Sequence, residues 1–184
     1  MISVKSIIKQ SLPSLVLVAA LGMVSGILLD TNKDSIMALP GILLAIPSFI
    51  NIGGVILSVL VSRLSSALHM GLIGYKNIRR TKTLENNIKA TYFNTFVSYL
   101  FIGVVVGGFN SLLGFHALGL FVFPIITLIA GLLTVSVLSA IGILFTYVSF
   151  RKGIDPENWV IAIMTTLGDM TGIFFLFTVV MMFI

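Results

Sequence analysis

Five long stretches of the chain are almost entirely apolar, and this feature limits the folds open to it more than any other. They cover residues 12–29, 36–62, 92–109, 118–149 and 157–183. A membrane-spanning helix needs about 20 predominantly apolar residues, and each stretch approaches or exceeds that length. Backbone groups inside a bilayer must pair with one another, so we expect an all-α integral membrane protein with five transmembrane helices.

The composition supports the same fold class. Of the 184 residues, 58% are hydrophobic and only 9% are charged, whereas soluble domains carry about 25% charged residues. The polar segments are short, so we expect residues 1–184 to form one transmembrane domain without a soluble regulatory domain. The chain has no cysteine, which excludes disulfides and cysteine-ligated metal sites. We expect neither a resident cofactor nor an enzyme active site.

The basic residues predict the orientation of the helices. With the N-terminus in the cytoplasm and the C-terminus outside, all of the 11 lysines and arginines except Lys33 lie on the cytoplasmic side, as the positive-inside rule requires. Dividing the long fourth stretch into two helices would move Arg151 and Lys152 to the outside. We therefore expect one tilted helix there, with Pro124 and Gly131 as positions of kinks.

The longest polar segment, residues 63–90, lies on the cytoplasmic side in this orientation. We expect an interfacial helical hairpin or loop whose basic side chains meet anionic lipid headgroups. The formal net charge of +5 follows from the orientation of the chain, and its distribution does not indicate a nucleic-acid partner. The expected location is the cell (plasma) membrane.

One acidic residue interrupts the last apolar stretch. Asp155, Pro156 and Glu157 predict a helix start, because they fit the N-cap, the first helical position and the positive end of the helix dipole. At 1.5 Å per residue, Asp169 lies about 20 Å along the axis from Pro156, near the middle of the bilayer. A carboxylate there costs about 2.5–3.5 kcal/mol and generally faces a cavity or a partner. We therefore expect Asp169 to be functional.

Small and polar residues follow one face of this last helix. At spacings of three and four they are Asn158, Ala162, Thr165, Asp169 and Gly172. Gly168 and Gly172 also form a GxxxG motif, which allows another helix backbone to approach closely.

The second apolar stretch carries a similar face. Pro40, Pro47 and the pair Gly53–Gly54 predict a broken or kinked helix, and carbonyls freed by a break must lie inside protein or beside water. A stripe at helical spacing consists of Asn51, Val55, Ser58, Ser62 and Ser65. Carboxylate, hydroxyl and carbonyl oxygens are hard ligands, which suit Mg²⁺, Ca²⁺ or Mn²⁺.

Two longer motifs contain these faces: IPSFINIGGVILSVLVSRLSSALHMG (46–71) and GIDPENWVIAIMTTLGDMTGIFFLF (153–177). The first resembles the second span of the MgtE-type magnesium transporters and their animal solute-carrier relatives, in which a break rich in proline and glycine precedes an SRLST-like sequence. The second is similar to the last span of that family, with its DP start and its threonine, leucine and aspartate core. The five-span count matches as well.

The resemblance implies a homodimer whose ion path lies between the protomers and is lined by the second and fifth spans. It assigns the central ion-binding acid to Asp169. Two Asp169 carboxylates would then meet near the two-fold axis, with Gly172 on the dimer seam. Together with the stripe of the second span, the candidate metal-binding residues are Asp169, Thr165, Asn51, Gly53, Gly54 and Ser58.

Two positions depart from the family pattern. Val55 replaces an asparagine that usually follows the glycine pair, and Leu57 replaces a glutamate of the animal branch. We expect Mg²⁺ as the transported ion, with Mn²⁺, Co²⁺ or Ca²⁺ as alternatives. Bacterial members also carry a cytosolic magnesium-sensing region before the membrane domain. Only about eleven residues precede the first apolar stretch here, so we expect that form of gating to be absent.

Two other functions are compatible with the residues. The first is proton-coupled transport of a small molecule, with Asp169 as the proton relay. The second is a non-transporting membrane subunit in which Asp169 pairs with a partner protein. The substitution Asp169→Asn distinguishes the three functions. It should remove divalent flux from a cation transporter, pH coupling from a proton-coupled transporter, and assembly from a non-transporting subunit. A channel or carrier mechanism and the direction of transport do not follow from the sequence.

Overall fold

The computed structural model describes residues 4–31, 41–74, 81–114, 119 and 121–183 of the chain. These residues form five helices, and no strand occurs among them. The helices are α1 (Val4–Thr31), α3 (Ile42–His69), α4 (Lys82–Leu112), α5 (Val122–Arg151) and α6 (Pro156–Val180). All five are long and apolar enough to cross a membrane, which confirms the expected all-α integral membrane protein.

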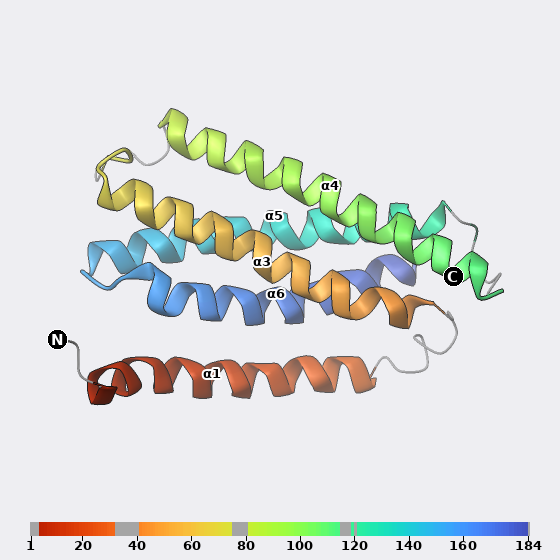
Figure 1. The fold of residues 1–184 in the computed structure, drawn as a ribbon, viewed down its shortest axis with the longest axis horizontal. Coiled ribbons are helices and arrows are strands. Elements are labelled where there is room, and N and C mark those ends of the chain that lie inside the picture. Colours follow the sequence, from red (N-terminus) through yellow and green to blue (C-terminus); the bar gives the residue numbers. More distant parts are fainter. Residues whose placement is uncertain (1–3, 32–40, 75–80, 115–118, 120, 184) are drawn as a thin grey trace.

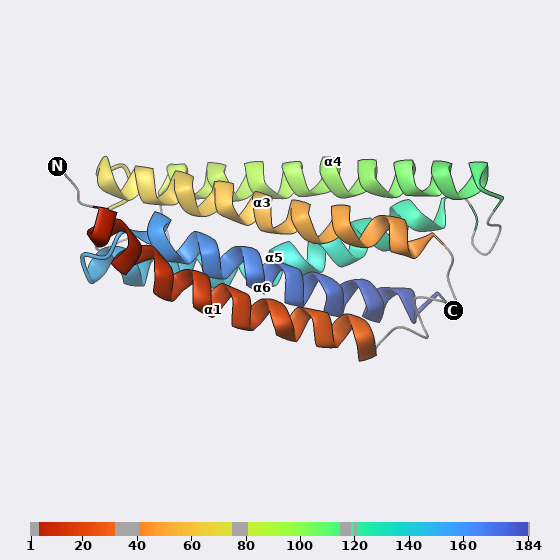
Figure 2. The ribbon, with the colours of Figure 1, turned by 60° about the horizontal axis from the view of Figure 1, so that its bottom comes forward.

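The five helices run alternately up and down in one bundle (Figure 1). α6 packs against α1, α3 and α5, and α4 packs against α3 and α5. A second view shows α3 and α4 on one side of the α5–α6 pair and α1 on the other (Figure 2). α3 and α6 therefore share the interior of the bundle, whereas α1 lies at its edge.

The described basic side chains gather at one end of the bundle, which we call the basic end. α3 and α5 finish there, and α1, α4 and α6 begin there (Figure 1). These side chains are Arg63, Lys82, Lys89, Arg151 and Lys152. The fold thus gathers them at one end of the bundle, which agrees with the expected positive-inside arrangement.

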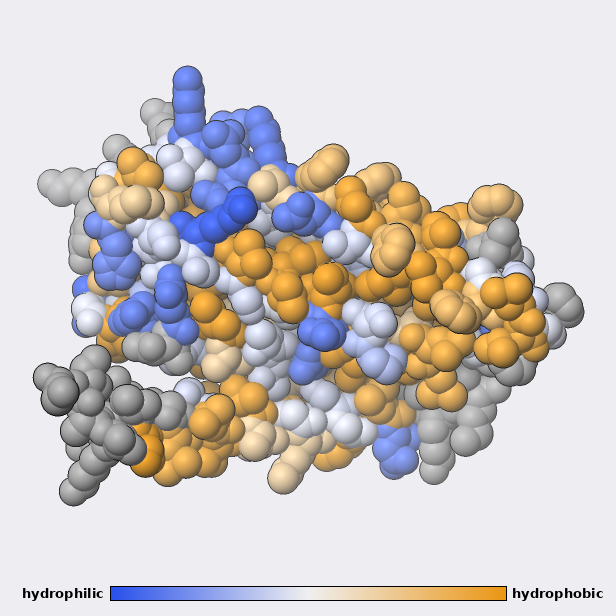
Figure 3. Space-filling model, in the orientation of Figure 1, coloured by the Kyte–Doolittle hydropathy of each residue, from blue (hydrophilic) through white to orange (hydrophobic). Residues whose placement is uncertain are grey.

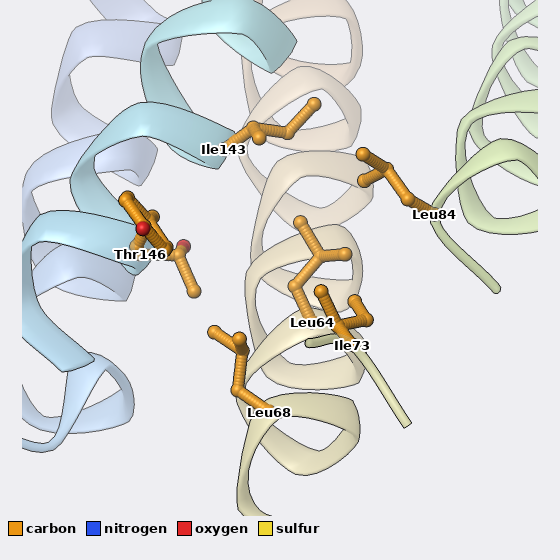
Figure 4. A pocket seen from close by; sticks show the side chains of 7 residues that line it. Leu64, Leu68, Ile73, Leu84, Ile143 and Thr146 are labelled. Carbon is orange, nitrogen blue, oxygen red and sulfur yellow. The ribbon is translucent and has the colours of Figure 1, made fainter. Parts of the chain in front are cut away.

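Most of the described part of the polar segment 63–90 is helical, because α3 continues to His69 and α4 begins at Lys82. Both helices therefore extend beyond the limits expected from apolar residues alone. A small apolar cluster forms between them and α5 at the basic end, and Figure 4 shows the hollow that it surrounds. The hollow is lined by Leu64, Leu68, Ile73, Leu84, Ile143, Thr146 and Tyr147.

The fourth apolar stretch forms the single helix α5, as expected from the charge pattern. Pro124 lies in its first turn, where the missing N–H has no partner within a helix in any case. Gly131 leaves room for an aromatic side chain of α4, because a Cβ at this position would overlap the ring of Tyr99. The contact with Tyr99 gives Gly131 a packing role that the sequence alone did not indicate.

Tyr99 is the side chain on which α3, α4 and α5 converge. It is fully buried, and its ring centroid lies 4.7 Å from that of Phe49 on α3. Its hydroxyl donates to the Phe49 carbonyl at 3.4 Å. A Cβ on Gly53 would lie only 2.7 Å from the same hydroxyl oxygen. A glycine is therefore needed at residue 53 for packing against α4.

The expected break in the second span is wrong for the described residues. α3 runs from Ile42 to His69 without interruption, through Pro47 and through the glycine pair. The pair remains helical because each glycine faces a neighbouring helix, Gly53 towards α4 and Gly54 towards α6. Pro40 lies outside the described residues.

Gly131→Ala is expected to lower the free energy of unfolding by about 1–3 kcal/mol, because the added methyl group displaces the Tyr99 ring. The matched control is Gly26→Ala in α1, where a Cβ meets nothing within 4 Å. That change should be neutral or stabilising by up to about 1 kcal/mol. Unfolding of the detergent-solubilised variants in SDS measures both effects, and equal stabilities would contradict the packing assigned to Tyr99.

Candidate functional site

The start of α6 is fixed by its own cap and by α3. The Asp155 carboxylate accepts a hydrogen bond from the Glu157 N–H at 3.0 Å, and Pro156 occupies the first turn. This confirms the predicted helix start. The Glu157 carboxylate in turn accepts a hydrogen bond from the Ser62 hydroxyl at 3.1 Å. The first turn of α6 is thereby tied to the last third of α3.

The backbones of α3 and α6 meet closely near the middle of both helices, at what we call the glycine crossing. A Cβ on Gly168 would lie 3.3 Å from both the Cα and the N of Gly54. A Cβ on Gly54 would lie 3.3 Å from the Cα of Thr165. The close approach expected at the GxxxG motif therefore occurs within one chain, with α3 as the neighbouring helix.

Gly172, the second glycine of that motif, is buried inside the chain. A Cβ there would lie 3.6 Å from the Phe49 ring, an ordinary contact distance. The expectation that Gly172 lies on a dimer seam is therefore wrong. Its face of α6 is already covered by α3.

The contacts between the antiparallel helices α3 and α6 define the depth of Asp169. Ser62 meets Glu157, Gly54 meets Thr165 and Gly168, and Phe49 meets Gly172. Asp169 therefore lies at the level of the α3 turn that contains Asn51, far from the basic end.

The Asp169 side chain is half-buried. Among the described residues, none forms an ion pair or a hydrogen bond with its carboxylate. One turn earlier on α6, the Thr165 hydroxyl donates to the Ala162 carbonyl at 2.8 Å, which leaves its oxygen lone pairs free to accept or to bind an ion. The site thus has an acid without a countercharge and a hydroxyl oxygen next to it along the helix.

The stripe predicted on α3 divides into an open part and a covered part. Asn51 is exposed, and Val55 is 48% exposed. Ser58 is half-buried, and its hydroxyl donates to the Gly54 carbonyl at 2.8 Å. Ser65 is buried. The open part of the stripe is therefore the half that lies nearest to Asp169.

A groove of about 380 Å³ runs between this open part of α3 and the middle of α4. Its lining residues are Ser48, Asn51, Ile52 and Val55 from α3, and Ser98, Phe101 and Ile102 from α4. In the space-filling view, hydrophilic surface interrupts the apolar surface over the middle of α3 and α6 (Figure 3). Sequence reasoning missed Ser48 and Ser98, because the register between α3 and α4 decides which serines face Asn51.

The structure brings the predicted site residues together in two groups. Gly54 and Thr165 meet at the glycine crossing beside Asp169, whereas Gly53 lies on the far side of α3, against Tyr99. Asn51 and the half-buried Ser58 border the open face. In the part of the chain that is described, no three histidine, aspartate or glutamate side chains form a cluster that could hold a metal ion. One chain therefore offers one carboxylate and several neutral oxygens on a face that is partly open.

Comparison with known families identifies the family of this chain. The model of the MgtE family, described as a divalent cation transporter, matches residues 46–179. The matched range covers α4 and α5 completely and nearly all of α3 and α6, so it contains the glycine crossing, Asp169 and the groove. No solved structure matches the chain.

Gly168→Ala should lower the free energy of unfolding by about 1 kcal/mol relative to Gly172→Ala, because only the first methyl group presses against backbone atoms of α3. The two variants make the same change on the same face of α6. Thermal unfolding in detergent measures the difference. If Gly172→Ala were the less stable variant, the register of α6 on α3 would be wrong.

Proposed function

Because the chain belongs to the MgtE family of divalent cation transporters, we propose that it carries Mg²⁺ across the cell membrane along a path between two copies of itself. The family consists of membrane transporters rather than enzymes, and divalent cation transport is its general function. The proposal adds the ion, the dimer and the lining of the path by α3 and α6.

The main support for this proposal is the Asp169 carboxylate beside the glycine crossing, which has no ion-pair or hydrogen-bond partner among the described residues. Keeping a charged group at the middle of a bilayer costs about 2.5–3.5 kcal/mol, so a carboxylate there is expected to serve a cavity or a partner. A divalent cation gains about twice the Coulomb energy of a monovalent one from the same carboxylate. Asp169 therefore favours Mg²⁺ over Na⁺ or K⁺.

A second copy completes the site in this proposal. Asp169 is the one acid that lies deep within an apolar stretch of the sequence, and a two-fold axis along the membrane normal would bring two such carboxylates together. Mg²⁺ sheds its waters reluctantly and is usually bound by one or two carboxylates plus water. The exposed Asn51 and the half-buried Ser58 support this arrangement, because polar groups at membrane depth need protein or water beside them.

The orientation and the membrane are also part of the proposal. The positive-inside rule places the basic end in the cytoplasm, and with it the N-terminus. Exposed side chains there, such as Lys82 and Arg151, are suited to anionic lipid headgroups. The plasma membrane is the proposed location.

Asp169→Asn should preserve folding and lower the Mg²⁺ flux at least about tenfold, because it removes the charge that attracts the ion. The control is Glu157→Gln, which neutralises an exposed acid at the start of the same helix. The flux of that variant should stay within about twofold of the unmodified protein, since solvent screens an exposed charge. Dye-reported uptake into liposomes containing each purified variant measures the flux.

Three outcomes of that experiment are distinct. Unmodified flux in Asp169→Asn would refute the ion site at this residue. Loss of pH coupling with divalent flux retained would favour a proton relay. If Asp169→Asn assembles poorly but the dimers that do form keep their full flux, Asp169 has a structural role.

Val55→Asn should lower the half-saturating Mg²⁺ concentration by up to about tenfold, equivalent to about 1.4 kcal/mol for one good polar contact. Val55 is next to Asn51 in the groove and supplies no oxygen. The control is Val104→Asn, at an exposed valine of α4 that does not line the groove. A Mg²⁺ titration of uptake compares the variants, and an unchanged value in Val55→Asn would show that residue 55 does not face the ion.

A further inference from the structure

The geometry points to a third helix in the ion path: we propose that Ser98 of α4 lines it, and that the groove between α3 and α4 is a water-filled part of that path which admits the hydrated cation. This inference rests on the proposed function, divalent cation transport along α3. It adds a residue and a helix that neither the sequence motifs nor the family match assigns to the path.

Three polar side chains face the groove from two helices. Ser48 and Asn51 come from α3, and Ser98 comes from α4. The remaining lining residues are apolar and form its walls. Ser98 is far from Ser48 and Asn51 in sequence, so the three side chains line the same groove only because of how α3 and α4 pack.

Ser48 and Ser98 differ from most other hydroxyl-bearing residues of the described helices. Ser58, Thr95 and Thr134, for example, donate to carbonyls one turn earlier at 2.8, 2.7 and 2.8 Å. Among the described residues, nothing forms a hydrogen bond with the side chains of Ser48, Asn51 or Ser98. A polar group at membrane depth needs a partner, so the groove requires water, an ion or another polar chain.

The groove opens at the depth of the ion-attracting acid. Ser98 precedes Tyr99, whose hydroxyl lies against Gly53 of α3. Asn51 is on the same turn of α3, and the contacts of α6 bring Asp169 to that level. The single turn of α3 around Asn51 therefore lies between the carboxylate and the groove.

The groove is large enough for a hydrated ion. Its volume is about 380 Å³, and one water takes about 30 Å³ in the liquid. That leaves room for more waters than the six of an octahedral Mg²⁺. Neutral hydroxyl and amide oxygens suit contacts to those waters without stripping them from the ion.

The absence of cysteine from the chain allows a direct test with Ser98→Cys. A water-soluble cationic methanethiosulfonate should modify this cysteine in the liposome-embedded protein, and Mg²⁺ should slow the reaction. The cationic adduct should lower the Mg²⁺ flux at least about tenfold, because it places a positive charge beside the ion. A neutral methyl adduct should change the flux by less than about twofold. The matched control is Val104→Cys on another face of α4, which should not react with the cationic reagent.

Two results would overturn the inference. Reaction of Ser98→Cys only with a lipid-soluble maleimide would show that lipid fills the groove, and no reaction with either reagent would show that protein covers it. Ser48→Cys, on the opposite wall, serves as a second variant if Ser98→Cys does not fold. Asp169→Asn is measured in parallel: if it loses flux while Ser98→Cys is unreactive, the proposed function stands and only the role of α4 fails.

Discussion

The close approach of α3 and α6 at Gly54 and Gly168 holds the two central helices of the bundle together. Lipid tails are as apolar as the helices, so helices in a bilayer associate through close packing rather than through the hydrophobic effect. The backbones can approach because neither glycine has a side chain. A Cβ added to Gly168 would lie only 3.3 Å from the Cα and N atoms of Gly54. This contact fixes the register of the two helices, and the register fixes the depth of Asp169.

The glycine pair of α3 serves two neighbours at once. Gly54 meets α6, whereas Gly53 meets Tyr99, which also packs on Phe49 and against Gly131 of α5. One turn of α3 therefore positions α4, α5 and α6 together. Asp169 and the groove lie at the same depth in the bundle, because this turn of α3 contacts both α6, which carries Asp169, and α4, which forms one wall of the groove. A side chain at either glycine is thus expected to shift the register of these helices, and with it the position of Asp169.

The fold was predictable where one physical rule decides it. Apolar length and the distribution of basic residues predict five helices, and Asp155 predicts the start of α6. The ends of α3 and α4 were not predictable in this way, because apolar residues mark the part of a helix in lipid and not its last hydrogen bond. The glycine pair was misinterpreted as a break, since flexibility and close packing both require glycine. Tyr99 and Ser98 were missed because their roles depend on the register between α3 and α4.

The proposed function requires that copies of this chain, without any other protein, carry a divalent cation across a membrane. The most direct test is Mg²⁺ entry into liposomes that contain the purified, unmodified protein and a trapped Mg²⁺-sensitive dye, with protein-free liposomes as the reference. Under the proposed function we expect Mg²⁺ entry that saturates with external Mg²⁺ and persists in excess K⁺. Entry no faster than in protein-free liposomes, with the protein folded and inserted, would contradict it.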